Sequence, residues 1–204
     1  MTAEKGDPVP ALPLNSRRRA LGYIVPFINA PITVWNAYSI AMTIMRGEAL
    51  NTPEFMNDVI LLIMGVFLVL YLPRMAPIYT NRYWFMENEL KISRFLWGTA
   101  RIPYKSIARA EVYIRDNSSG PVSKDALKSS RDSIEALRRS GFKINDCTNS
   151  EEVIVLIVGE KSAHMISPAY QKAFIQKLRK KVGTMPVRLV ELNSKGKRVR
   201  ELPA

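Results

Sequence analysis

Two long apolar stretches dominate the first third of the chain. Residues 20–45 contain no charged side chain, and a second uncharged stretch runs from Val59 to Pro73. As a helix, the first stretch would be about 39 Å long, which exceeds the roughly 30 Å hydrocarbon core of a bilayer. The pattern predicts a transmembrane helical hairpin over residues 20–78, preceded by an N-terminal cytoplasmic segment, residues 1–19.

The second helix of this hairpin has a clear start in the sequence. Asn51 or Thr52 offers an N-cap, and Pro53 suits the first helical position. From Pro53 to Leu72 the helix would be about 30 Å long, enough to cross a bilayer. The short connection over residues 46–52 predicts that the two helices are antiparallel neighbours.

The first apolar stretch also contains prolines and asparagines. Pro26 and Pro31 favour a bent helix, while the side chains of Asn29 and Asn36 need hydrogen-bond partners. We expect a bent anchor helix in which Asn29 and Asn36 are intramembrane polar contacts. The alternative is that these amides bond to a neighbouring helix in this chain or another.

Lysine and arginine near the ends of the two helices predict their orientation. Arg17, Arg18 and Arg19 precede the first helix and Arg74 follows the second, whereas the connecting loop has only Arg46. The positive-inside rule therefore predicts a multi-pass inner-membrane protein with both termini in the cytoplasm. A cleaved signal peptide is the alternative, but its apolar region would be much longer than usual.

The rest of the chain alternates apolar and polar positions as β-strands do. Tyr83–Phe85 and Leu90–Ile92 flank a turn, and Ile107–Arg115 alternates so regularly that we expect one buried and one solvated face. Val153–Val158 is the most apolar segment here and is expected to be central in its sheet. His164–Ile166 is expected as its return strand.

Two segments change to helical periodicity. Residues 123–140 form an amphipathic pattern with Ser123 as N-cap and Gly141 as the residue after the helix. A second helix is predicted from Ser167, as N-cap, to a stop at Gly183. Residues 184–204 are expected to be a basic flexible tail.

Composition limits the chemistry that the chain can perform. The formal net charge is +12, and the chain has one cysteine, Cys147, and one histidine, His164. These residues allow no intrachain disulfide and no ordinary zinc site. No phosphate-binding glycine loop, nucleophile elbow or HExxH motif is present in the sequence. We therefore expect a protein that is not an enzyme, without a catalytic residue, cofactor or metal, and no nucleic-acid partner.

Three segments resemble the membrane-anchored type of the bacterial pleckstrin-homology-like domain family: YWFMENELKI (83–92), IPYKSIARAEV (102–112) and ISPAYQKAFIQKL (166–178). The resemblance implies an α+β membrane protein, in which a transmembrane hairpin precedes a PH-like cytoplasmic domain over residues 79–183. That domain would be an antiparallel β-barrel or curved sheet with an inserted helix and a C-terminal capping helix. The resemblance implies no reaction.

These observations favour a non-enzymatic interaction or scaffold module at the cytoplasmic membrane face. Such a module would bind protein partners as an accessory subunit of a larger membrane complex. One alternative is a sensor of anionic lipid at the bilayer surface, and another is a subunit of a membrane enzyme or transporter whose chemistry lies in another chain. The residues expected to contact the membrane surface or a partner are basic: Arg17, Arg18, Arg19, Arg74, Lys177, Arg179, Lys180 and Lys181.

Overall fold

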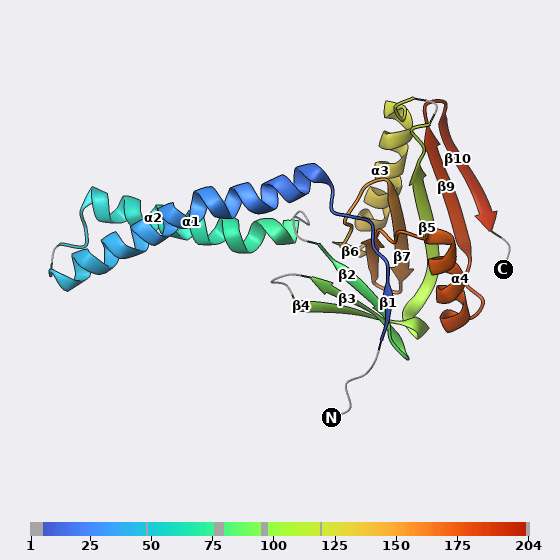
Figure 1. Cartoon of the computed structure of the whole chain (residues 1–204), viewed down its shortest axis with the longest axis horizontal. Helices are drawn as coiled ribbons and strands as arrows, with labels where there is room; N and C mark the ends of the chain where they lie inside the picture. The colour runs from blue at the N-terminus through green and yellow to red at the C-terminus, as the bar shows by residue number, and fades with distance from the viewer. Residues whose placement is uncertain (1–5, 48, 76–79, 95–97, 119, 203–204) are drawn as a thin grey trace. The chain divides into compact units, whose positions relative to one another are not determined.

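The chain forms two compact units of different architecture (Figure 1). The computed structural model describes residues 6–47, 49–75, 80–94, 98–118 and 120–202, with the backbone only for residues 70–75. Unit 1 combines Met1–Asn15 with Thr80–Ala204, and unit 2 is Ser16–Tyr79. Unit 2 is helical and unit 1 is α+β. Because unit 2 lies between the two segments of unit 1 in the sequence, the helical hairpin is an insertion in the α+β unit.

Unit 2 consists of two helices, α1 (Ser16–Met45) and α2 (Pro53–Met75), which pack side by side. The hydroxyl of Thr52 accepts a hydrogen bond from the amide of Phe55, so the expected N-terminus of the second helix is confirmed. The helices approach closely at Gly65, where a Cβ atom would collide with the Thr33 side chain. The hairpin itself is therefore present.

The predicted membrane span is wrong. Among the residues that the structure describes, no helix is both long enough and apolar enough to cross a bilayer. α1 is long, but polar side chains such as Asn29, Thr33 and Asn36 interrupt it. In α2, the described apolar side chains run only from Val59 to Val69, about 17 Å at the standard helical rise. The transmembrane fold class and the multi-pass inner-membrane location are corrected accordingly.

Unit 1 contains two β-sheets in its described residues. The first has the order β1-β2-β3-β4 and is antiparallel throughout. The second has the order β10-β9-β5-β7-β8-β6, and two of its pairings, β5 with β9 and β6 with β8, are parallel. The strands are β1 (Asp7–Val9), β2 (Arg82–Phe85), β3 (Glu89–Arg94), β4 (Gly98–Pro103), β5 (Ile107–Arg115), β6 (Lys143–Asp146), β7 (Val153–Gly159), β8 (Ser162–Ile166), β9 (Val187–Asn193) and β10 (Gly196–Leu202).

This mixed sheet corrects the expected antiparallel barrel. A parallel pair needs a crossover connection, and here α4 (Gln171–Val182) lies in the chain between β8 and β9. α4 is therefore not a C-terminal cap. Residues expected to be a flexible tail form β9 and β10 instead, and Val187, Val190 and Leu192 of β9 are buried.

Two apolar cores lie on opposite faces of the six-stranded sheet. On one face, the four-stranded sheet and α4 enclose a core that includes Leu90, Val155 and Leu178. On the other face, α3 (Lys124–Arg139) covers a smaller core that includes Leu156 and Val190. Figure 1 shows α3 and α4 on different sides of these strands. The sheet is thus covered on both faces, and the solvated face expected for residues 107–115 is wrong.

Most element predictions in unit 1 are confirmed. β2 and β3 form the expected hairpin, β7 is an interior strand, and β5 has the predicted bounds. Ser123 caps α3 by accepting a hydrogen bond from the amide of Ala126, and Gly141 follows it with φ of 85°. The last helix begins at Gln171 rather than after Ser167, because the Ser167 hydroxyl accepts from the amides of Asn149 and Ser150 instead.

A buried amide joins the two ends of the chain that lead to the helical hairpin. The Asn149 side chain donates to the carbonyls of Leu12 (3.1 Å) and Asn81 (3.0 Å) and accepts from the Asn81 amide (2.7 Å). The Asn149 carbonyl accepts from the amide of Asn15 at 2.9 Å. One buried residue therefore bonds both to the segment before α1 and to Asn81, which follows α2 in the chain.

Candidate functional site

The helical hairpin exposes many large apolar side chains. On α1, Phe27 is 82% exposed and Trp35 is 68% exposed, and on α2 Ile63 is 63% exposed. Among the side chains that the structure describes, those exposed on the hairpin are Leu21, Tyr23, Ile24, Phe27, Ile28, Ile32, Val34, Trp35, Tyr38, Ile44, Met45, Leu50, Met56, Ile60, Leu61, Ile63, Met64, Val66, Phe67 and Leu68. We call these side chains the hairpin surface.

The two asparagines of α1 have different partners. Asn29 donates to the carbonyl of Gly65 in α2 at 2.7 Å, whereas Asn36 donates to Ile32 of its own helix at 2.8 Å. The interhelical bond of the alternative is therefore present at Asn29, but the intramembrane setting expected for Asn29 and Asn36 falls with the predicted membrane span. Asn29 fixes the packing of α1 on α2, and Asn36 is buried within the hairpin.

The basic residues expected at a contact surface are distributed over both units. Arg17, Arg18 and Arg19 lie in the first turn of α1, and Arg74 lies near the end of α2, where only the backbone is described. The remaining four are on α4: Lys177, Arg179, Lys180 and Lys181.

Two of the four basic residues on α4 have partners inside unit 1. The ammonium of Lys177 lies 2.9 Å from Asp7 and 5.2 Å from the centre of the Phe85 ring. The Arg179 guanidinium donates to the carbonyl of Leu202 at 3.0 Å. These two residues tie β1 and β10 to α4, while Lys180 and Lys181 are exposed.

The only histidine and the only cysteine of the sequence are both buried. Burial, followed by the charges of Arg94 and Lys143, lowers the pKa of His164 to about 4. Burial raises the pKa of the Cys147 thiol to about 11. At neutral pH both groups are uncharged and shielded from solvent, as expected of residues that contribute to the core.

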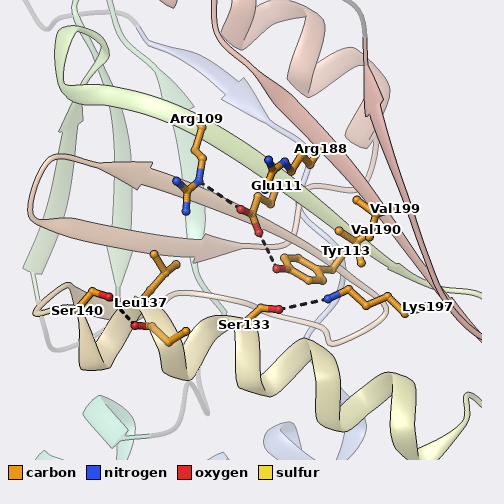
Figure 2. A pocket seen from close by; sticks show the side chains of 11 residues that line it. Arg109, Glu111, Tyr113, Ser133, Leu137, Ser140, Arg188, Val190, Lys197 and Val199 are labelled. Atoms are coloured by element: carbon orange, nitrogen blue, oxygen red, sulfur yellow. Dashed lines mark hydrogen bonds and ion pairs between the residues drawn. The ribbon is translucent and has the colours of Figure 1, made fainter.

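A polar pocket of about 300 Å³ lies between α3 and the strands β5, β9 and β10 (Figure 2). Its lining combines charged, hydroxyl and apolar side chains. They are Arg109, Glu111 and Tyr113 of β5, Ser133, Ala136 and Leu137 of α3, Ser140 after α3, Arg188 and Val190 of β9, and Lys197 and Val199 of β10. This pocket is a candidate binding site in unit 1.

The floor of the pocket is a buried carboxylate with two partners. Figure 2 shows Glu111 between Arg109 and Tyr113: one carboxylate oxygen accepts from the Tyr113 hydroxyl at 2.7 Å, and the other lies 3.3 Å from Nε of Arg109. Burial and the hydrogen bond to Glu111 raise the pKa of Tyr113. Tyr113 therefore remains protonated near neutral pH and keeps donating to Glu111.

Sequence reasoning missed this pocket. Alternation in β5 assigned Arg109, Glu111 and Tyr113 to a face in water, whereas α3 covers that face. The sequence did contain a weak signal of the pocket. The polar positions of β5 and the serines of α3 carry side chains that can hydrogen-bond to one another or to a ligand when the two elements pack together. The pairing of β5 with β9, which brings Arg188 beside them, is a tertiary feature.

Comparison of the chain with protein-family models, with curated proteins and with solved structures gives no match. The hairpin surface and the pocket are therefore the features that bear on the function of the protein.

Proposed function

We propose that the protein is a non-enzymatic interaction module that binds another protein through its hairpin surface. The observation that carries this proposal is the exposure of aromatic and aliphatic side chains along both helices. At about half exposure these side chains form an apolar area on the order of 1,000 Å², above the roughly 300–600 Å² of the largest patch on a typical monomer. Patches of this size are typical of protein interfaces.

The hairpin surface also indicates the chemistry of the partner. Residues 20–45 and 59–69 carry no charge, so an acidic or basic partner helix would lose hydration there without gaining an ion pair. Ile63 and Met64, and Val66 and Phe67, are exposed pairs of consecutive residues, which project about 100° apart around a helix. The proposed partner therefore presents uncharged apolar helices on more than one side of the hairpin.

A different protein suits this surface better than a second copy of the chain does. Each copy carries a formal net charge of +12, so self-association brings two strongly basic chains together. An isologous dimer would also cover one side of each hairpin and leave the others in water. A different protein that is not basic avoids the charge repulsion, and its apolar helices can cover more than one side of the hairpin.

The state of the buried nucleophile and base supports the non-enzymatic part of the proposal. Cys147 is fully buried with a raised pKa, and His164 is buried with a lowered pKa. Neither residue can reach a substrate without opening the core.

Site-specific photo-cross-linking in the cells that naturally make the protein tests this proposal. A photoreactive phenylalanine analogue replaces Trp35 on the hairpin surface, and in the control chain it replaces Arg131, which is exposed on α3. We expect one adduct of discrete mass from position 35 and none from position 131. Mass spectrometry of the adduct is expected to identify an uncharged helical segment of a different protein.

A double substitution, Phe27→Ser with Ile63→Ser, is expected to lower the adduct yield at least about tenfold, since interface aromatic and aliphatic anchors carry most of the binding energy. Both side chains are exposed, so the hairpin should still form. The proposal is contradicted by an adduct of twice the chain mass, by cross-linking to lipid alone, or by equal yields at positions 35 and 131.

A further inference from the structure

The pocket between α3 and β5, β9 and β10 is formed by residues of unit 1 alone. Its described lining has three cationic side chains, Arg109, Arg188 and Lys197, and one carboxylate, Glu111. The lining therefore has an excess of two positive charges. No residue of this described lining belongs to the hairpin surface that binds the proposed protein partner.

The carboxylate does not cancel the charge at the mouth of the pocket. Glu111 is 8% exposed, and both of its oxygens are directed to floor residues, one to Tyr113 and one to Arg109. Because Arg109 neutralises Glu111 locally, the excess charge belongs to Arg188 and Lys197. These two side chains come from the paired strands β9 and β10.

Lys197 is held in place by neutral groups. Its ammonium lies 3.2 Å from the Ser133 hydroxyl and 3.4 Å from the Ser129 hydroxyl, both on α3 (Figure 2 shows the bond to Ser133). Within the described part of the chain, no carboxylate forms an ion pair with Lys197. The hydroxyls orient the ammonium but leave its charge uncompensated, as suits a group that binds an anion.

Arg188 can turn toward the same anion at little cost. Its present partner is Glu201, with Nε 3.3 Å from the carboxylate, and both side chains are more than half exposed. Exposed ion pairs of this kind contribute roughly 0–1 kcal/mol. An arginine fork that gives up Glu201 for a phosphate or carboxylate forms two parallel hydrogen bonds.

The remaining wall of the pocket is apolar. Leu137, Ala136, Val190 and Val199 line it beside the cations. A volume of about 300 Å³ is at the lower end of the roughly 300–1,000 Å³ found for small-molecule sites. The occupant is therefore small, and it combines an anionic group with a short carbon skeleton.

We propose that this pocket binds a small organic phosphate monoester. The phosphate lies between Lys197 and Arg188, whose two charges match its dianion, and the carbon skeleton lies against Leu137 and Val199. A dianion is favoured over a single carboxylate because Lys197 has no carboxylate partner among the described residues and Arg188 can exchange the exposed Glu201 for the phosphate.

Calorimetric titration of the full chain at physiological salt tests the proposal, with glycerol 3-phosphate as the probe. Parallel titrations use glycerol, inorganic phosphate, and vesicles that contain phosphatidic acid, which carries the same phosphate on a lipid. We expect saturable binding of glycerol 3-phosphate, no binding of glycerol, and at least about tenfold weaker binding of inorganic phosphate, which lacks the carbon skeleton. Binding of the vesicles alone, or of inorganic phosphate as tightly as glycerol 3-phosphate, would overturn the proposal.

Variants locate the site. Lys197→Gln and Arg188→Gln are each expected to weaken binding at least about tenfold, since each removes a charged hydrogen-bond donor. Lys195→Gln is the matched control, because Lys195 is exposed in the same β9–β10 turn and does not line the pocket. An equal loss in Lys195→Gln would overturn the proposal by showing unspecific attraction to a basic chain.

Amide shifts of the unsubstituted chain keep the test decisive if a variant does not fold. On titration with glycerol 3-phosphate, the amide resonances of Ser133, Val190 and Lys197 are expected to shift together and to saturate. Shifts confined to residues away from the pocket, or the absence of any saturable shift, would overturn the proposal.

Discussion

At the scale of single residues, burial decides which polar groups remain neutral. His164 is 8% exposed on β8, and the charges of Arg94 and Lys143 add to the cost of protonating it. Its Nδ1 atom is buried without a hydrogen-bond partner in the described structure. A proton on this ring would therefore place a charge in the core, where Nδ1 has no described partner and the charges of Arg94 and Lys143 repel it.

This burial predicts a pH dependence of stability. The pKa of His164 is about 4 in the folded chain and about 6.5 in the unfolded chain, so between these values the unfolded chain binds more protons. The contribution of neutral His164 to the free energy of unfolding is therefore fully present above pH 6.5 and is lost as the pH drops toward 4. We expect a loss of about 2 kcal/mol between pH 7 and pH 5, measured by urea denaturation.

The variant His164→Gln is the control for this prediction, because glutamine does not titrate. Its free energy of unfolding is expected to change by much less between pH 7 and pH 5, before the carboxylates titrate. Equal pH dependence in both proteins would show that another group is responsible.

At the scale of elements, local signals predicted most of the strands and helices of unit 1. Ser123 and Gly141 bound α3, and alternation marked β5, because these signals depend on backbone geometry within a few residues. The prediction failed for β9 and β10. Their many lysines and arginines suggested a mobile tail, but the charges lie mainly on exposed positions of a hairpin whose first strand is buried.

A substitution in β9 tests whether residues 187–202 form a packed hairpin or a flexible tail. Val190 is 3% exposed and faces Val199 of β10, which is 52% exposed. Val190→Asp places a carboxylate in the core beneath α3, and we expect the free energy of unfolding of unit 1 to fall by at least about 3 kcal/mol. Thermal unfolding followed by circular dichroism measures this change.

Val199→Asp is the matched control on the partner strand. Because Val199 is largely in solvent and cationic side chains lie nearby, we expect a change within about 0.5 kcal/mol. If both substitutions were equally mild, residues 187–202 would not be part of the core.

At the scale of the whole molecule, the hairpin is an insertion in the α+β unit. The segments before α1 and after α2 both bond to Asn149, so the ends of the insertion are close together in unit 1. Each unit also has its own packing: α1 with α2 through Asn29 and Gly65, and the two sheets with α3 and α4. Unit 1 is therefore expected to fold without unit 2.

Replacing residues 16–79 by a flexible linker of about six glycine and serine residues tests this expectation. A linker of that length spans roughly 14 Å on average, enough to join two segments that share one residue as partner. We expect unit 1 to keep a cooperative thermal transition and its β-sheet circular dichroism. Loss of cooperative unfolding would show that the sheets require the hairpin.

The sequence alone determined the helical hairpin, the helix ends of α3, and the strand segments of β2, β3, β5 and β7. These features follow from contacts between residues close in the chain and from hydrophobic periodicity. The tertiary structure alone decided the parallel pairing of β5 with β9, the covering of β5 by α3, and the pocket floor at Glu111. Each of these depends on residues far apart in sequence, and no local pattern reveals which distant surface will cover a given face.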